Sequence, residues 1–463
     1  MNDRPAAIHS SPHIPFPESG AYPVRPGNHV RPLIDGEATL RRIAEAVDAA
    51  ERSVWVTVAF LSPAFLMPDG RGSLFDELDR AAARGLDVRV IFWRNNPESA
   101  GFRYVFAGSE ADRAMLRARD ARFRIRWDRV NGIYCHHQKS WLIDAGLPSE
   151  TAFVGGINLT EHAMTTPGHL TGSEFHDLYL EVAGPSATDV HHNFVQRWNE
   201  ASERHRVDGL WGHGADDVLP FPERVSGVRG ESLVQIQRSI PAGLYTNPRA
   251  TPGGRSHAIA EGERSILDQY LLAIDAARRS IYLEHQSIAI EPILARLDVA
   301  LERGVEVVCL VPGVPEDHVR KARHVPERKP QFDRLAALAR HPHFTLAGMA
   351  VPRDGGRADV YVHAKAMLVD DAWATIGSSN LHAFSLFGHT ELNASFWAPE
   401  VVRALRCELL AEHLGEDTGG LDDVAALRLY REIAAGNRRR RDRGDAAWRG
   451  LAYRLDPATY GES

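Results

Sequence analysis

The chain has 463 residues, of which 44% are hydrophobic, and a formal net charge of −7. This composition is typical of a globular protein with two or three domains or one large duplicated domain. The net negative charge argues against a general binder of polyanions, and three cysteines exclude a paired disulfide framework.

The N-terminal residues 1–27 are rich in proline, histidine and serine and predict an extended arm lying on the domain. They lack the charged and then apolar pattern of a secretory signal, and no stretch of the chain reaches the ~18 apolar residues of a membrane span. The sequence therefore predicts a cytoplasmic protein without a transmembrane segment, for which contact with a membrane surface stays open.

Helices and apolar strands alternate twice along the chain in the same order. The first series predicts a helix at 36–50, a strand at 53–60, a helix at 73–84 and a strand at 87–93; the second predicts a helix at 265–277, a strand at 280–284, a helix at 292–303 and a strand at 305–311. Such alternation implies crossover connections and mixed sheets. We expect an α/β fold of two pseudo-symmetric halves, each a mixed sheet flanked by helices: an arm at 1–27, halves at 28–210 and 231–415, a linker at 211–230 and a helical segment at 416–463.

A short frame of polar residues recurs once in each half. The chain has only four lysines against fifty arginines, and two of the four stand in the frames His137, Lys139, Asp144 and His363, Lys365, Asp370. Lysine at both positions indicates that a compact ammonium is needed there. Each frame precedes an apolar strand, so the histidine and lysine, two residues apart, should share one face. His136 should point to the opposite face and stays outside the predicted chemistry.

Two facing histidines can divide the work of cleaving a phosphodiester. One imidazole can attack phosphorus if a carboxylate holds its other nitrogen, while the second gives a proton to the leaving alkoxide. The lysines and the asparagines that follow, Asn158 and Asn380, would hold the non-bridging oxygens. This scheme requires neither a metal nor a cofactor.

The candidate carboxylates fall into two groups with different expected roles. Asp144 and Asp370 belong to the frames, but because they close their strands, a structural supporting role is favoured over contact with substrate. Asp177 and Glu391 each precede an apolar strand and are the candidates for holding the histidines, with Glu174 as the alternative to Asp177.

At this point the sequence resembles the phospholipase D superfamily, whose signature is His-x-Lys-x4-Asp followed by Gly-Ser-x-Asn. The second copy matches through Gly377, Ser378 and Asn380, whereas the first has Gly156 in place of the serine and ten residues rather than six between Asp144 and Gly155. The resemblance implies a monomer with one site at the junction of two fused halves. It also implies a phosphohistidine intermediate, with His137 as nucleophile and His363 as acid and base.

The resemblance leaves several activities open. Cleavage of phospholipid headgroups is favoured, with transfer to water or to an alcohol, and Phe384, Leu386 and Phe387 could form an interfacial surface or pack internally. The alternatives are a transferase similar to cardiolipin synthases and a metal-independent nuclease acting on single-stranded nucleic acid. The basic run 438–441 indicates either a solvated helix end or a contact with anionic lipids.

Overall fold

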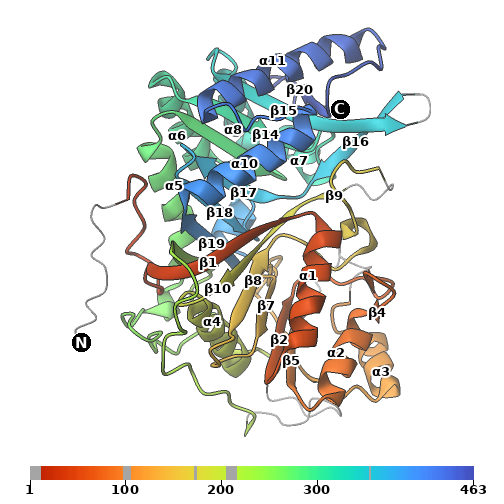
Figure 1. Ribbon diagram of the computed structural model, residues 1–463, viewed down its shortest axis with the longest axis vertical. Coiled ribbons are helices and arrows are strands. Elements are labelled where there is room, and N and C mark those ends of the chain that lie inside the picture. Colours follow the sequence, from red (N-terminus) through yellow and green to blue (C-terminus); the bar gives the residue numbers. More distant parts are fainter. Residues whose placement is uncertain (1–11, 97–105, 171–174, 205–215, 354–355, 463) are drawn as a thin grey trace.

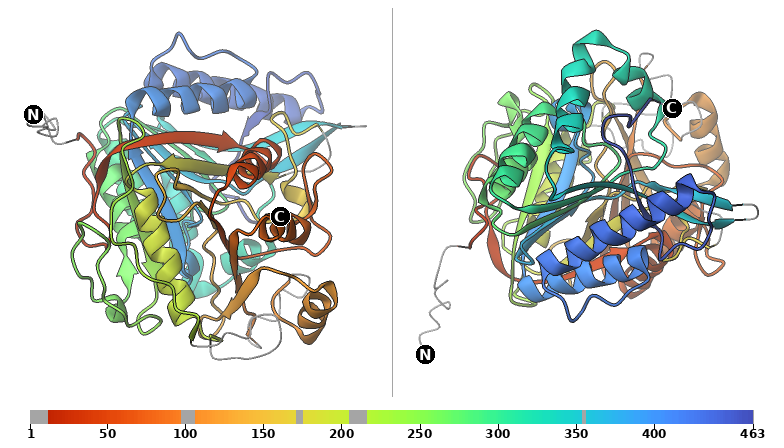
Figure 2. Two further views of the ribbon diagram at one scale, coloured as in Figure 1. Left: turned by 60° about the horizontal axis from the view of Figure 1, so that its bottom comes forward. Right: turned by 90° about the horizontal axis from the view of Figure 1, so that it is seen from above.

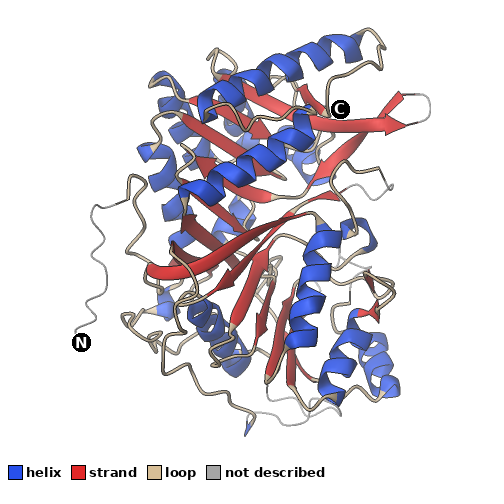
Figure 3. Cartoon of the chain, viewed as in Figure 1, coloured by secondary structure: helices blue, strands red, loops and turns tan. Residues whose placement is uncertain are grey.

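A computed structural model describes residues 12–96, 106–170, 175–204, 216–353 and 356–462. Each half of the chain forms a mixed sheet, and strand pairing between the halves joins the two sheets in the middle of the molecule, with helices on the outer faces (Figures 1 and 3). This is the α/β architecture of two similar halves that the sequence predicted.

The sheet of the first half has the spatial order β6-β5-β2-β7-β8-β10-β1. Strands β2, β5 and β6 run parallel to one another, whereas the pairs β2–β7, β7–β8, β8–β10 and β10–β1 are antiparallel. The bounds are β1 (Arg25–Ile34), β2 (Ser53–Val58), β5 (Asp87–Trp93), β6 (Arg124–Asp128), β7 (Ser140–Ile143), β8 (Thr151–Gly155) and β10 (Leu178–Ala183).

The sheet of the second half repeats this order and these directions as β15-β14-β13-β17-β18-β19-β11. The bounds are β11 (Ser232–Ile240), β13 (Ser280–His285), β14 (Glu306–Leu310), β15 (Phe344–Arg353), β17 (Lys365–Val369), β18 (Trp373–Gly377) and β19 (Glu391–Trp397). The motif strands β7 and β17 occupy equivalent central places, so the two histidines are related by the duplication.

Further strands complete the sheets or form a small hairpin of their own: β3 (Leu66–Met67), β4 (Gly72–Ser73), β9 (Phe175–His176), β12 (Glu263–Arg264), β16 (Gly356–Val362) and β20 (Ala452–Arg454). The pair β9–β16 is important for the site, because β9 belongs to the first half and β16 to the second. Thus β9 of the first half lies beside β16, the strand of the second half that ends directly before His363.

The crossover helices form close to where the pattern placed them. In the first half these are α1 (Gly36–Ala49) and α2 (Leu74–Ala83), and in the second α5 (Ser265–Ala276) and α6 (Glu291–Glu302). Ser73 begins α2 with a reciprocal capping box to Asp76, which satisfies amides that the helix itself leaves free. Gly85 and Gly304 follow α2 and α6 at φ of 87° and 85°, the left-handed conformation that favours glycine after a helix.

The remaining helices are α3 (Glu110–Arg119), α4 (Ala187–Glu200), α7 (Asp317–Arg323), α8 (Lys329–Leu338), α9 (Ala383–Phe387), α10 (Pro399–Leu414) and α11 (Asp423–Asp442). Helices α10 and α11 pack side by side across one end of the molecule (Figure 2). None of the helices in the described ranges is both long and apolar enough to cross a bilayer.

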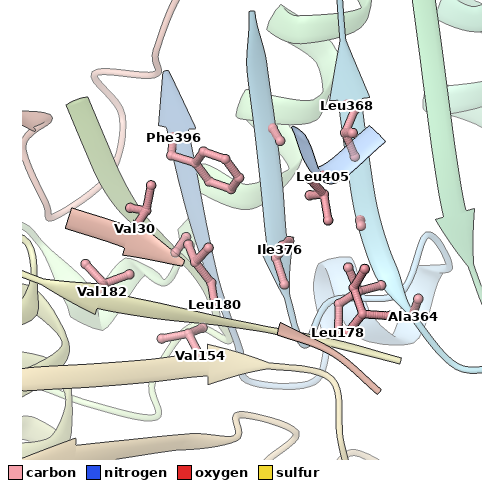
Figure 4. Close-up of a cluster of buried hydrophobic side chains, with 14 of the residues drawn as sticks. Val30, Val154, Leu178, Leu180, Val182, Ala364, Leu368, Ile376, Phe396 and Leu405 are labelled. Carbon is pink, nitrogen blue, oxygen red and sulfur yellow. The ribbon is translucent and has the colours of Figure 1, made fainter. Parts of the chain in front are cut away.

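The core between the two sheets is shared by both halves. Figure 4 shows Leu180 and Val182 of β10 facing Ile376 of β18 and Phe396 of β19, all of which are buried. Burying a side chain of this kind stabilises the fold by roughly 1.5–3 kcal/mol. The halves therefore form one folded unit, and separate cores lie under the outer helices of each half.

The predicted boundaries separate residues that belong to the same structural element or sheet. The boundary at residue 27 falls inside β1, which pairs with β10 and also contacts β11 of the second half. Within the arm, the Ile14 carbonyl accepts a hydrogen bond of 2.7 Å from Trp397 Nε1, so the arm lies on the second half. The helical segment after residue 415 contains α11 as predicted, but it also returns β20 to the sheet beside β15. Of the predicted linker, residues 211–215 lie outside the described part of the chain.

Candidate active site

Each motif histidine is anchored through its backbone to the opposite half. The amide of His137 donates to the Thr390 carbonyl at 2.9 Å, and the amide of His363 donates to the His176 carbonyl at 2.8 Å. Thr390 and His176 directly precede the candidate acids Glu391 and Asp177. The duplication thus brings each histidine to the start of the strand that carries the other half's carboxylate.

Glu391 of the second half holds His137 of the first. Nδ1 of His137 lies 3.0 Å from both Glu391 carboxylate oxygens and 3.1 Å from the Ser378 carbonyl. The Ser378 hydroxyl donates to Glu391 Oε2 at 2.5 Å. A proton on Nδ1, directed at acceptors only, leaves the electron pair of His137 on Nε2.

Asp177 of the first half holds His363 of the second, with Nδ1 and Oδ2 separated by 2.5 Å. The glycine that replaces the signature serine in this half has a steric reason. A Cβ on Gly156 would lie 2.3 Å from Asp177 Oδ1, which is much shorter than a van der Waals contact. Gly156 therefore supports the acid by leaving space for it, while Ser378 supports Glu391 by a hydrogen bond.

The two lysines lie beside their own histidines. Lys139 Nζ donates to the His137 carbonyl at 2.9 Å, and Lys365 Nζ donates to the His363 carbonyl. Burial, which penalises the ammonium, lowers the pKa of Lys139 to about 7 and that of Lys365 to about 8. Both groups can titrate near neutral pH, and a bound anion would favour their charged forms.

The histidines share one electrostatic environment. Burial lowers the pKa of His137 well below its ordinary value, and the nearby charges of Lys139, Lys365 and His363 lower it further. Burial and Lys365 also lower the pKa of His363, but the Asp177 carboxylate opposes that effect. His137 is thereby favoured as the neutral imidazole, and His363 has the stronger tendency of the two to accept a proton.

Asn158 and Asn380 follow the ends of β8 and β18. The Oδ1 atom of each is buried without a hydrogen-bond partner among the described residues. A buried polar atom without a partner carries a free-energy cost. An amide oxygen only accepts hydrogen bonds, so these atoms suit a donor, whereas the predicted contacts with substrate oxygens would come from the Nδ2 groups of the two asparagines.

Asp144 and Asp370, which the sequence grouped with the histidines and lysines, bind backbone amides in the structure. They lie at the ends of β7 and β17 remote from the histidines. Asp144 Oδ1 accepts the amides of Glu51 and Arg52 at 2.8 Å each, and Asp370 Oδ1 accepts those of Arg279 and Ser280 at 2.8 Å each. Each aspartate therefore ties its motif strand to the start of the neighbouring strand, β2 or β13. This is the supporting role that the sequence favoured.

Several aromatic residues near the site gave no signal in the sequence. The Phe60 ring lies 5.7 Å from that of His137, and Phe175 and Tyr361 lie 5.6 and 6.1 Å from the His363 ring. They belong to no repeated pattern, so only the folded chain identifies them. His136, set aside in the sequence, binds Asp128 and Thr390 away from the site. Glu174, the alternative to Asp177, lies outside the described residues.

Comparison with known proteins gives consistent results. Phospholipase D alpha 1 of Arabidopsis thaliana is 24% identical over 467 residues, covering 76% of this chain and 55% of that protein. Phospholipase D A of Dictyostelium discoideum is 25% identical over 509 residues, covering 90% of this chain and 36% of that protein. The chain thus spans about half the length, or less, of these relatives.

The structural comparison concerns the fold alone. A crystal structure of phosphatidylserine synthase from Haemophilus influenzae Rd KW20 superposes with a TM-score of 0.54 at 14% identity, covering 88% of this chain and 93% of that one. A family model described as "Cardiolipin synthase, PLD-like domain" matches residues 43–198 and 270–412, one segment in each half. Since these segments amount to well over half of the chain and contain both motifs, the chain belongs to this PLD-like family and, with it, to the phospholipase D superfamily.

Proposed function

We propose that this protein is a phospholipase D-type phosphodiesterase that cleaves the headgroup ester of phospholipids and passes the phosphatidyl group to water or to an alcohol. The observation that supports it best is the crossed arrangement of the site. Two histidines from different halves, each held through Nδ1 by a carboxylate of the other half, share their surroundings with two buried lysines. This is the set of groups that a double displacement at phosphorus needs.

In the first step, Nε2 of His137 attacks phosphorus and the bond to the headgroup oxygen breaks. Protonated His363 gives its proton to the leaving alkoxide. The anionic phosphodiester, placed near both rings, favours the charged forms of His363 and of the lysines. Lys139, Lys365 and the two asparagines bind the non-bridging oxygens, whose charge persists throughout the step.

In the second step, neutral His363 takes a proton from water or an alcohol as that oxygen attacks phosphorus. The bond between phosphorus and His137 Nε2 breaks, and the imidazole regains its electron pair. Glu391 stabilises the positive charge that His137 carries while it is bonded to phosphorus. A single chain supplies both histidines, so we propose that the monomer is active.

Exposed apolar residues near the site favour a lipid substrate over a nucleic acid. Ile133, Phe384 and Phe387 are exposed by 50%, 39% and 41%. The Phe384 ring lies 6.0 Å from that of His389, which in turn lies 5.9 Å from the His137 ring. This connected series of rings would place a membrane surface close to the nucleophile.

The proposal is tested with vesicles of phosphatidylcholine, phosphatidylethanolamine, phosphatidylglycerol or cardiolipin, with and without a primary alcohol. Headgroup release that is abolished by His137→Ala and by His363→Ala supports it, and formation of a phosphatidyl alcohol identifies transfer. Degradation of single-stranded DNA without lipid turnover would instead identify a nuclease. Headgroup release that persists in both variants would refute the mechanism.

A further inference from the structure

A second cluster of histidine and carboxylate side chains lies at the seam of the two halves, and it does not include the side chains of Asp177 and Glu391 that hold the motif histidines. It contains Asp35 at the end of β1, His169 and His176 of the first half, and Glu412 of α10. Each offers one ligand atom, and these atoms all lie within 4.8 Å of one another. The side chains of Asp35, His169 and His176 are fully buried, and that of Glu412 is exposed by 7%.

The spacing of the ligand atoms fits a small metal ion. His176 Nδ1 lies 3.1 Å from Asp35 Oδ1, His169 Nε2 lies 3.1 Å from Glu412 Oε1, and His169 Nε2 lies 3.7 Å from Asp35 Oδ2. Around a tetrahedral Zn²⁺ with bonds of about 2.0–2.1 Å, ligand atoms lie about 3.3 Å apart. The ligand atoms all lie within 4.8 Å of one another, so the side chains would draw closer together to surround an ion of this size.

Several polar atoms of these four residues are buried without a hydrogen bond to any described residue. His169 Nδ1, Asp35 Oδ2 and Glu412 Oε2 are buried without a hydrogen bond in the described part of the chain. Nε2 of His169 approaches Glu412 in an orientation that makes no hydrogen bond either. Buried polar groups are nearly always satisfied, and such a concentration of exceptions indicates a bound ion or water that completes the site.

The charges of the cluster also call for a cation. Three buried carboxylates, those of Asp35, Glu284 and Glu412, surround His176. His169 and His413 also lie 3.1 and 3.9 Å from Glu412 and Glu284. A divalent cation bound among these groups would balance the buried carboxylates while the imidazoles stay neutral.

The surroundings of His176 resemble the outer support of a metal ligand. While Nδ1 faces Asp35, Nε2 lies 3.1 Å from Glu284 Oε2, and the Tyr282 hydroxyl donates to Glu284 Oε1 at 2.7 Å. Histidines that bind metals usually direct their other nitrogen to a carboxylate in this way. The geometry leaves Nδ1 as the nitrogen for the ion.

We propose that Asp35, His169, His176 and Glu412 form a binding site for one divalent first-row transition metal ion, for which Zn²⁺ is the probe. Two histidine nitrogens and two carboxylate oxygens are a ligand set that Zn²⁺ accepts. Because Glu412 belongs to the second half and the other ligands to the first, the ion clamps the halves together.

The clamp would also fix one acid of the catalytic site. The Asp35 amide donates to the Asp177 carbonyl at 2.9 Å, and Asp35 Oδ1 accepts the Asp177 amide at 3.2 Å. Asp177 in turn holds His363. The ion therefore acts on the reaction through position alone and takes no part in the chemical steps.

The test measures metal binding and thermal unfolding rather than activity. The full chain is stripped with a chelator, incubated with ZnCl₂, dialysed against metal-free buffer and analysed for bound metal. The wild type should retain about one Zn²⁺ per chain, and excess Zn²⁺ should raise its Tm by about 3 °C or more. His169→Ala and Glu412→Gln should each retain less than a tenth of that amount and show no rise in Tm.

A matched control is His191→Asn, which removes a buried histidine paired with a single carboxylate, Glu150, at 2.8 Å. This variant should bind Zn²⁺ as the wild type does, whereas a general effect of losing a buried histidine would alter it too. Failure of the stripped wild type to retain Zn²⁺, or equal retention by His169→Ala, would overturn the proposal. If a variant does not fold, Co²⁺ added to the wild type decides, because its visible spectrum distinguishes tetrahedral binding from none.

Discussion

Replacing Glu391 by glutamine keeps the shape of the side chain and removes the charge that faces His137. The two groups lie 3.0 Å apart and both are buried. At an effective dielectric constant of about 20, a carboxylate and an imidazolium at this distance attract each other by roughly 5 kcal/mol. Since each 1.4 kcal/mol is a factor of ten in rate, the full loss corresponds to a decrease in kcat of about 10⁴.

The amide of glutamine can still accept a hydrogen bond from Nδ1, so we expect kcat to decrease by about 10³ to 10⁴. KM should change little, because Glu391 holds the nucleophile and is not among the groups assigned to the substrate. Steady-state kinetics on a monomeric short-chain phospholipid separates the two quantities without the complication of a membrane surface.

Glu181→Gln provides the matched control for Glu391→Gln. Glu181 is a buried carboxylate of β10 that pairs with Arg42 at 2.6 Å and has no contact with either motif histidine. Its substitution should leave kcat within a few-fold of the wild type. A folded Glu391→Gln variant, shown by an unchanged unfolding transition, with kcat within tenfold of the wild type would refute the reasoning.

Three further predictions concern other parts of the site. Lys139 must be charged to bind phosphate, and its pKa is about 7, so kcat/KM should fall as the pH rises through about 7–8. The substitution Lys139→Arg should shift this decrease to higher pH. An unshifted pH profile would contradict the role of Lys139. Asparagine tolerates the left-handed φ of 58° at Asp144, so Asp144→Asn removes only a charged hydrogen-bond acceptor. The free energy of unfolding in urea should decrease by roughly 1.5–3 kcal/mol, and kcat of the folded variant should stay within a few-fold of the wild type. A decrease in kcat of more than 10²-fold would indicate a catalytic role for Asp144. The double substitution Phe384→Ser and Phe387→Ser should lower activity on vesicles at least about tenfold and leave activity on a monomeric phospholipid unchanged. The control is Val299→Ser, which changes an exposed apolar residue of α6. Equal effects on both substrates would argue against interfacial contact.

The sequence predicted the regular parts of the fold because both signals it used are local. Apolar periodicity gave the crossover helices and the parallel strands within a few residues of their observed ends. Gly85 and Gly304 follow the crossover helices at positive φ, a helix end that depends on local conformation alone. The repeated frame located the two histidines and lysines because duplication preserved their spacing.

The crossed pairing of acids and histidines could not be read from the same pattern. Asp177 lies 40 residues after His137 and Glu391 lies 28 residues after His363, yet each acid holds the histidine of the other half. This crossed pairing depends on two long-range contacts, the strand pair β9–β16 and the β-bridge between His136 and Thr390. Periodicity within one segment carries no information about such contacts.

Strands β1 and β11 were missed for a related reason. β1 lies where the proline-rich arm was expected to end, and β11 lies close to the predicted linker; both are recognised only when they complete the sheets. Gly156 was the opposite case. Its departure from the signature was visible in the sequence, but its cause, the Asp177 carboxylate lying where a Cβ would be, required the folded chain.

The central claim is that His137 bonds to phosphorus while His363 transfers the proton, and a phosphatidyl ester of p-nitrophenol tests it most directly. This leaving group needs no proton, so the first step no longer depends on His363, whereas the second step still does. His363→Asn should therefore release a burst of about one equivalent of p-nitrophenol per chain and then stop, and His137→Asn should release none. A burst that survives His137→Asn, or its absence from His363→Asn, would contradict the account.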